Sequence, residues 1–140
     1  MTDHLVHTGS IEQELQDWYD TLPSLTAAVP SESVTSGDNQ DQDQPLPYIV
    51  LEVASENEWN TNTGKGYAAE VMWRVYTDDK QDGATIANSL SDSTSGFNRK
   101  TRTGTTYRIT RCRYVSTEFE QNDNELWLHT VTFSISYQAV

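Results

Sequence analysis

Six of the nine basic residues of this chain are concentrated in one short segment. They are Arg99, Lys100, Arg102, Arg108, Arg111 and Arg113. The segment contains no Asp or Glu, whereas residues 1–64 contain no Lys or Arg at all. Because arginine forms paired hydrogen bonds with carboxylates, such a segment suits an acidic protein surface, and we take the six residues as candidate subunit-interface residues. The alternative is that the basic and acidic segments are both solvated surfaces.

The overall charge limits the partners of the chain. A formal net charge of -12 argues against tightly held nucleic acid, because phosphate binding requires clustered Lys and Arg. No apolar run is long enough to span a bilayer, and the N-terminus lacks the features of a signal peptide, so we expect no membrane partner. The single cysteine, Cys112, excludes an intramolecular disulfide and is expected to be a small buried strand residue.

Catalytic motifs are not evident in the sequence. The only histidines are His4, His7 and His129, and only His129 falls in a clear strand pattern. It shares the apolar phase of that strand, which indicates a packed or interface histidine. No nucleophile elbow, phosphate loop, paired-cysteine zinc spacing or dinucleotide glycine pattern occurs. We therefore expect no enzymatic activity and no cofactor.

Two groups of aspartates have structural explanations. Asp78 and Asp79 precede a helical pattern and are expected to cap it. Asp38, Asp41 and Asp43, close together in one loop, suggest calcium ligands. Their segment lacks the glycine and the terminal glutamate of a calcium-binding loop, so we expect no metal site.

Periodicity in the sequence predicts the main elements. Strict alternation of apolar and polar residues, or a nearly continuous apolar run, indicates four strands. Apolar residues at helical spacing indicate two helices. The strands are expected at 46–55, 67–77, 105–119 and 127–138, and the helices at 10–22 and 79–90. This order, α-β-β-α-β-β, predicts an α+β fold in a single domain 1–140. It comprises one antiparallel or mixed sheet of about four strands with two helices packed on one face.

The segments between these elements carry further expectations. Residues 1–9 are expected to form a mobile arm, and 31–44 a flexible acidic loop with only Val34 apolar. The asparagine-rich stretch 56–66 reads as a turn. Pro23 is expected to end the first helix or begin a short second turn. A switch of the apolar phase between Ile109 and Cys112 predicts a β-bulge.

Three sequence patterns, with their order and spacing, match those of a known family. They are the strand opening Leu46-Pro47-Tyr48-Ile49-Val50, the strand 69–76 followed by Ala84, Ile86, Ala87 and Leu90, and the closing pattern Glu125-Leu126-Trp127-Leu128-His129 through Phe133 to Tyr137. On these grounds the chain resembles the tail-completion proteins of long-tailed phages and viruses, the tail terminator and tail-to-head joining family. The resemblance covers about residues 46–137. The acidic loop 31–44 and the turn after Glu56 depart from it.

The resemblance implies a structural virion protein without enzymatic activity. Such proteins form a ring, usually a homo-hexamer, at the head-proximal end of the tail tube, where they stop tube polymerisation and join the tail to the head connector. The implied partners are the tail tube protein and the connector or neck protein. DNA passes through an acidic lumen without tight binding. The implied location is the tail or neck of the virion, after assembly in the host cytoplasm.

Two other functions fit the sequence. One is a head-completion or stopper protein of the neck, one layer nearer the capsid. The other is a small-molecule-binding α+β domain that uses Tyr67, Trp73 and Trp127 on a concave sheet face. Aromatic residues in an apolar phase belong more often to a core than to a pocket, and we expect Trp73 to be a core residue.

Overall fold

The computed structural model describes residues 2–36, 45–61, 64–122 and 125–140, and for residues 2–10, 55–61 and 64–65 it describes the backbone alone. The described residues form three α-helices, one 3-10 helix and six strands. In chain order they are α1 (Thr2–Tyr19), α2 (Pro23–Ala28), η1 (Ser31–Ser33), β1 (Val34–Ser36), β2 (Tyr48–Thr61), β3 (Gly64–Thr77), α3 (Lys80–Ser91), β4 (Arg102–Thr103), β5 (Tyr107–Gln121) and β6 (Trp127–Ala139).

The strands form one curled mixed sheet in the order β1-β2-β3-β6-β5-β4. β1 pairs with β2 in parallel, and the other pairs are antiparallel. The predicted fold class is therefore wrong, since about four strands and two helices in the order α-β-β-α-β-β were expected. The four long strands were predicted, but β1 and β4 were not. Strands of three and two residues are too short to show a side-chain period, and backbone hydrogen bonds to a neighbouring strand place them.

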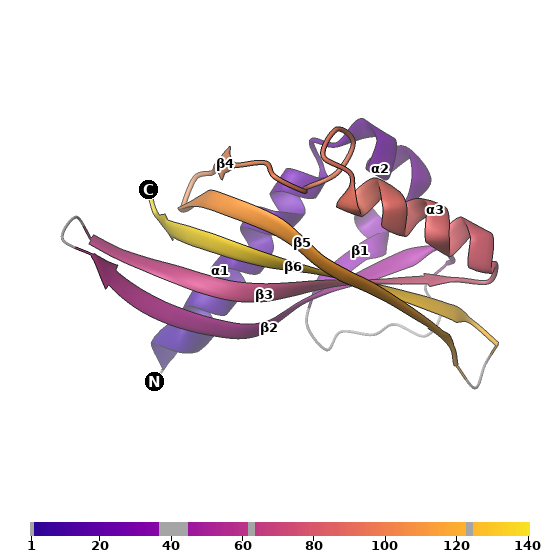
Figure 1. Ribbon diagram of the computed structural model, residues 1–140, viewed down its shortest axis with the longest axis horizontal. Helices are drawn as coiled ribbons and strands as arrows, with labels where there is room; N and C mark the ends of the chain where they lie inside the picture. The colour runs from indigo at the N-terminus through magenta and orange to yellow at the C-terminus, as the bar shows by residue number, and fades with distance from the viewer. Residues whose placement is uncertain (1, 37–44, 62–63, 123–124) are drawn as a thin grey trace.

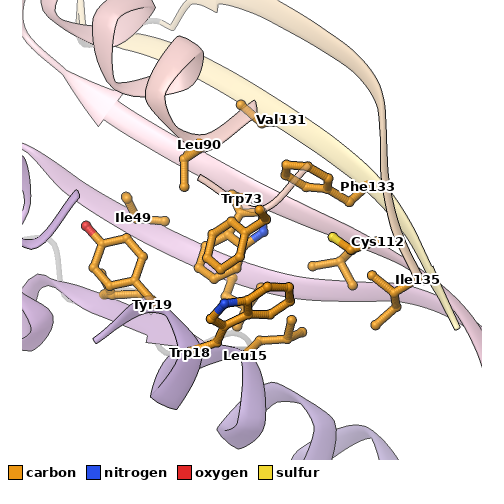
Figure 2. Packing of buried hydrophobic residues seen from close by; sticks show 14 of the residues in the cluster. Leu15, Trp18, Tyr19, Ile49, Trp73, Leu90, Cys112, Val131, Phe133 and Ile135 are labelled. Carbon is orange, nitrogen blue, oxygen red and sulfur yellow. The ribbon is translucent and has the colours of Figure 1, made fainter. Parts of the chain in front are cut away.

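The core lies between one face of the sheet and the three helices. In Figure 1, α1 crosses behind the sheet. Helices α2 and α3 lie next to each other at the upper right of the view. Trp73 of β3 is only 1% exposed. Its ring stacks on Phe97 at 4.8 Å and on Tyr19 of α1 at 5.9 Å between centroids. Figure 2 shows Trp73 among Trp18, Tyr19 and Phe133, and its predicted core position is confirmed.

The N-terminal helices differ from the prediction in their boundaries. α1 begins at Thr2 and not at Ser10, so residues 2–9, for which a mobile arm was expected, are helical. It ends at Tyr19, and Pro23 begins α2, one of the two outcomes expected for this proline. The buried Tyr19 hydroxyl donates to the carbonyl oxygens of Leu25 at 2.9 Å and Val29 at 2.7 Å. These bonds fix α2 against the end of α1.

Two expected connections are partly regular structure. Residues 31–36 of the expected acidic loop form η1 and β1, and Val34 is 8% exposed and joins the core. Asp38, Asp41 and Asp43, which were considered as calcium ligands, lie outside the described residues. Most of the expected turn 56–66 is extended, because β2 runs to Thr61 and β3 starts at Gly64 in continuous antiparallel register. Pairing with a neighbouring strand here overrides turn-forming composition.

The expected bulge in the third long strand is confirmed. The register of β5 against β6 shifts between Ile109 and Arg111, which returns Cys112 to the buried face. A second shift, between Tyr114 and Ser116, was not predicted. The first bulge lets the strand present Arg111 and Arg113 on one face while Ile109 and Cys112 stay in the core.

Candidate functional site

Four of the six predicted interface residues line one open depression. Its volume is about 430 Å³, and its walls are Arg99, Lys100, Thr101, Thr110, Arg111, Cys112 and Arg113. None of these lining residues is acidic. We call Arg99, Lys100, Arg111 and Arg113 the basic surface. Four cations around one depression repel one another unless anions lie close by, so this surface suits carboxylates of another molecule.

The loop that carries Arg99 and Lys100 is fixed along the edge of β5. The Arg99 N–H donates to the Cys112 carbonyl at 2.8 Å, and the Asn98 side-chain oxygen accepts the Tyr114 N–H at 2.9 Å. Arg99 has a left-handed backbone, with φ at 62°. Phe97, just before the loop, is 1% exposed and anchors it in the core. The basic surface is therefore held in place by the fold.

Arg102 is directed to its own chain. Its Nε lies 3.8 Å from Oε2 of Glu14 on α1, and the Glu14 side chain is 5% exposed. Oε1 of Glu14 also accepts the Thr106 N–H at 2.9 Å. Gly104 leaves room for this carboxylate, because a Cβ at that position would collide with it. Glu14 thus links α1 to the loop between β4 and β5, and Arg102 belongs to this link.

Arg108, Arg111 and Arg113 point to the face of the sheet opposite the helices. In the register of β5 and β6 they stand beside Gln138, Ser136 and Ser134 respectively. All three arginines are exposed. The small serine side chains beside Arg111 and Arg113 leave these guanidinium groups open to a partner. The structure therefore brings together Arg99, Lys100, Arg111 and Arg113, places Arg108 on the same face as Arg111, and separates Arg102.

Cys112 lines the depression but has no chemical role there that the geometry supports. Cys112 is 3% exposed, which confirms the predicted buried position in a strand. Burial raises the pKa of the thiol to about 12, so the sulfur stays protonated near neutral pH. A protonated, buried thiol is a poor nucleophile. The chemistry available at this site is therefore ionic recognition.

His129 is a packed residue, as predicted. It is 2% exposed and stacks on Phe119 with 5.6 Å between ring centroids. Gly83 of α3 lies against its ring, where a Cβ would collide. Burial, with Lys80 as a second cause, lowers the pKa of the imidazole, and the neutral form is favoured. The side chains of His4 and His7 fall outside the described ones.

The remaining candidates have structural roles. The Asp79 carboxylate accepts the Gln81 N–H at 2.8 Å, which confirms it as the cap of α3. Of the three aromatic residues considered for a ligand pocket, Tyr67 and Trp73 are buried beneath the helices, and the half-buried Trp127 packs beside Lys80 and Phe119. Among the described residues, no three His, Cys, Asp or Glu side chains gather as metal ligands. No described helix is long and apolar enough to cross a membrane.

Comparison with known proteins reveals similarity at the level of fold. A chain from the virion of a native gene transfer agent (GTA) particle has a similar structure. The TM-score is 0.53 at 16% sequence identity, over 81% of this chain and 83% of that chain. At this identity the likeness establishes a shared fold. No protein-family model and no curated protein sequence matches the chain.

Three residues that build the site were not predicted from the sequence. Glu14, Phe97 and Asn98 hold Arg102 and the loop of the basic surface. Glu14 lies among other acidic helix residues, and only its distant partners distinguish it. Phe97 is the one large apolar residue between α3 and β4, and that isolation is a usable signal for an anchor.

Proposed function

We propose that this chain is a structural component of a phage-like virion. The observation that carries the proposal is its fold similarity to a chain of the gene transfer agent virion, which covers more than four-fifths of both chains. The site supports it, because the basic surface offers binding without catalytic groups. A protein of this kind functions by assembling with other virion proteins, and the virion is its proposed location.

Within the virion, we assign the chain to the tail-terminator role. The protein would form a homo-hexameric ring between the tail tube protein and the head connector. A ring of identical subunits needs two different, complementary surfaces on each copy. The basic surface is one of them. The exposed Asp17, Asp20 and Glu32, which belong to the stretch 1–64 without Lys or Arg, provide the other.

The net charge fits a ring around DNA. At -12 the protein repels phosphate on average, which suits DNA that passes through the lumen. Carboxylates of the neighbouring subunit would neutralise the basic surface in the ring and keep it away from DNA. Exposed ion pairs each contribute at most about 1 kcal/mol, so several must act together.

The experiment is native mass spectrometry of the purified chain and of a triple variant, Arg99→Gln, Arg111→Gln and Arg113→Gln. We expect a closed oligomer, with six copies as the leading state, that the triple variant weakens. Arg102 is left unchanged because its loss would leave the buried Glu14 carboxylate of the same chain without its neighbouring cation. The matched control, Gln81→Glu, Thr85→Glu and Asn88→Glu on the exposed side of α3, changes the net charge by the same amount.

Two results would contradict this role. One is a wild-type chain that remains monomeric at high micromolar concentration. The other is a triple variant that assembles normally but loses retention of duplex DNA at physiological salt. The second result would make the basic surface a DNA contact. Thermal unfolding of each variant checks that the substitutions leave the fold intact.

A further inference from the structure

The outer edge of β5 is covered along only half of its length. β4 pairs with Ile109 and Arg108, and the loop at Asn98 and Arg99 bonds to Tyr114 and Cys112. Beyond Tyr114, no strand or loop among the described residues bonds to this edge. The end of β5 runs with β6 to a hairpin that projects at one end of the sheet (Figure 1). We call residues 115–121 the open edge.

The backbone of the open edge points outward at alternate residues. The Asn122 N–H donates to the Leu126 carbonyl across the hairpin, at 2.9 Å. Since residues of an antiparallel pair alternate between bonded and non-bonded positions, Thr117, Phe119 and Gln121 direct their N–H and C=O groups away from β6. A strand laid along this edge would satisfy them.

Apolar side chains accompany these free backbone groups. Phe119 is 55% exposed and Val115 is 54% exposed, and both belong to the few large apolar residues that are exposed in the described part of the chain. Phe119 is held in place, because it lies against His129 and carries the Lys80 ammonium 4.6 Å above its ring centre. An aromatic side chain that is exposed but fixed is a ready contact for a partner side chain.

Charge decides which strand fits this edge. Glu118 and Glu120 are exposed and stand on the face of the sheet opposite Phe119. If two copies paired through this edge around a two-fold axis centred on Phe119, Glu118 of one copy would face Glu120 of the other, which is unfavourable. A strand with Lys or Arg opposite the two glutamates, and an apolar residue between them opposite Phe119, is complementary on both faces.

We propose that the open edge is a docking site for a β-strand of another protein with a basic, apolar, basic alternation. The partner strand extends the sheet beyond β5 by backbone hydrogen bonds to Thr117, Phe119 and Gln121. Its basic side chains contact Glu118 and Glu120, and its apolar side chain covers Phe119. This site is separate from the basic surface, and it does not depend on ring formation.

The test uses the full chain and a capped peptide, Thr-Lys-Val-Lys-Val-Lys-Val-Thr, followed by amide hydrogen exchange with residue resolution. We expect the peptide to slow exchange of the N–H groups of Thr117, Phe119 and Gln121. The N–H groups of Glu118 and Glu120 already bond to β6 and serve as internal references. The same peptide with Glu in place of Lys should bind about tenfold more weakly or worse.

Variants make the test specific. Glu118→Lys with Glu120→Lys should reverse the preference between the two peptides. The control Glu70→Lys with Asp20→Lys changes the charge equally at exposed sites on β3 and after α1 and should not. The proposal is overturned if both peptides bind equally, if protection appears at β2 instead, or if the free chain self-associates through residues 117–121.

Discussion

The two halves of β5 differ in what covers them. From Tyr107 to Tyr114 the strand is bonded on both sides, by β6 and by β4 with the loop at Asn98. From residue 115 to 121 it is bonded to β6 alone among the described residues. The first half carries Arg111 and Arg113 of the basic surface, and the second carries Glu118, Glu120 and the exposed Phe119.

The two halves of β5 can therefore meet a partner in different ways. The covered half has no free edge, so it can meet a partner only through side chains, and its arginines suit ionic contacts. The open half can pair through its backbone, which gives direction and register to a contact. One strand can thus support two kinds of assembly contact, which suits the proposed role among several neighbours in a virion.

Alanine substitution of a core and an edge aromatic gives the largest contrast. Trp73→Ala should destabilise the fold by about 3–5 kcal/mol, because the cavity lies beneath Phe97, the anchor of the basic loop. Phe119→Ala on the open half should cost about 1 kcal/mol or less, since the ring is half exposed. Urea unfolding measures both. A soluble Trp73→Ala protein with wild-type stability would show that the Trp73 side chain does not stabilise the core.

A substitution at Gly104 tests how the covered half is tied to α1. Gly104→Ala should cost about 1–3 kcal/mol, because the methyl group displaces the Glu14 carboxylate from the Thr106 N–H and from Arg102. Thr105→Ala, an exposed change in the same loop, is the control and should stay near wild type. Equal stabilities of the two variants would show that Glu14 moves aside without loss.

A smaller effect, dependent on pH, is expected beneath the open half. The pKa of His129 is lowered in the folded protein by burial and by Lys80, so the unfolded chain binds its proton more readily. The contribution of His129 to stability is therefore complete above pH about 6.5 and is lost as the pH falls below that value. His129→Gln should flatten this part of the profile of unfolding free energy against pH. An unchanged slope would show that His129 takes up its proton without cost in the folded state.

The long strands and the apolar faces of the helices were predictable, because the spacing of apolar residues along an element shows which of its faces is buried. β6 follows its alternation closely, and the phase switch near Cys112 located a bulge. The buried stripe of α3, with Ile86 and Leu90, was also predicted. In each case the signal is local to the element, so one sequence suffices.

The errors arose where distant pairing decides the structure. β1 has one apolar residue, Val34, and exists because β2 offers it a backbone edge. The composition of the polar end of β2 predicts a turn, yet pairing with β3 keeps this segment extended. Arg102 was grouped with its sequence neighbours, but its partner Glu14 comes from the other end of the chain. No local pattern reports such contacts.

Cryo-electron microscopy of particles from cells that encode this chain tests the proposed role most directly. We expect density for the chain as a ring at the head-proximal end of the tail tube, with the basic surface of each copy against carboxylates of the next. Particles that lack the chain, or that contain it in the capsid shell or the distal tail, would contradict the assignment.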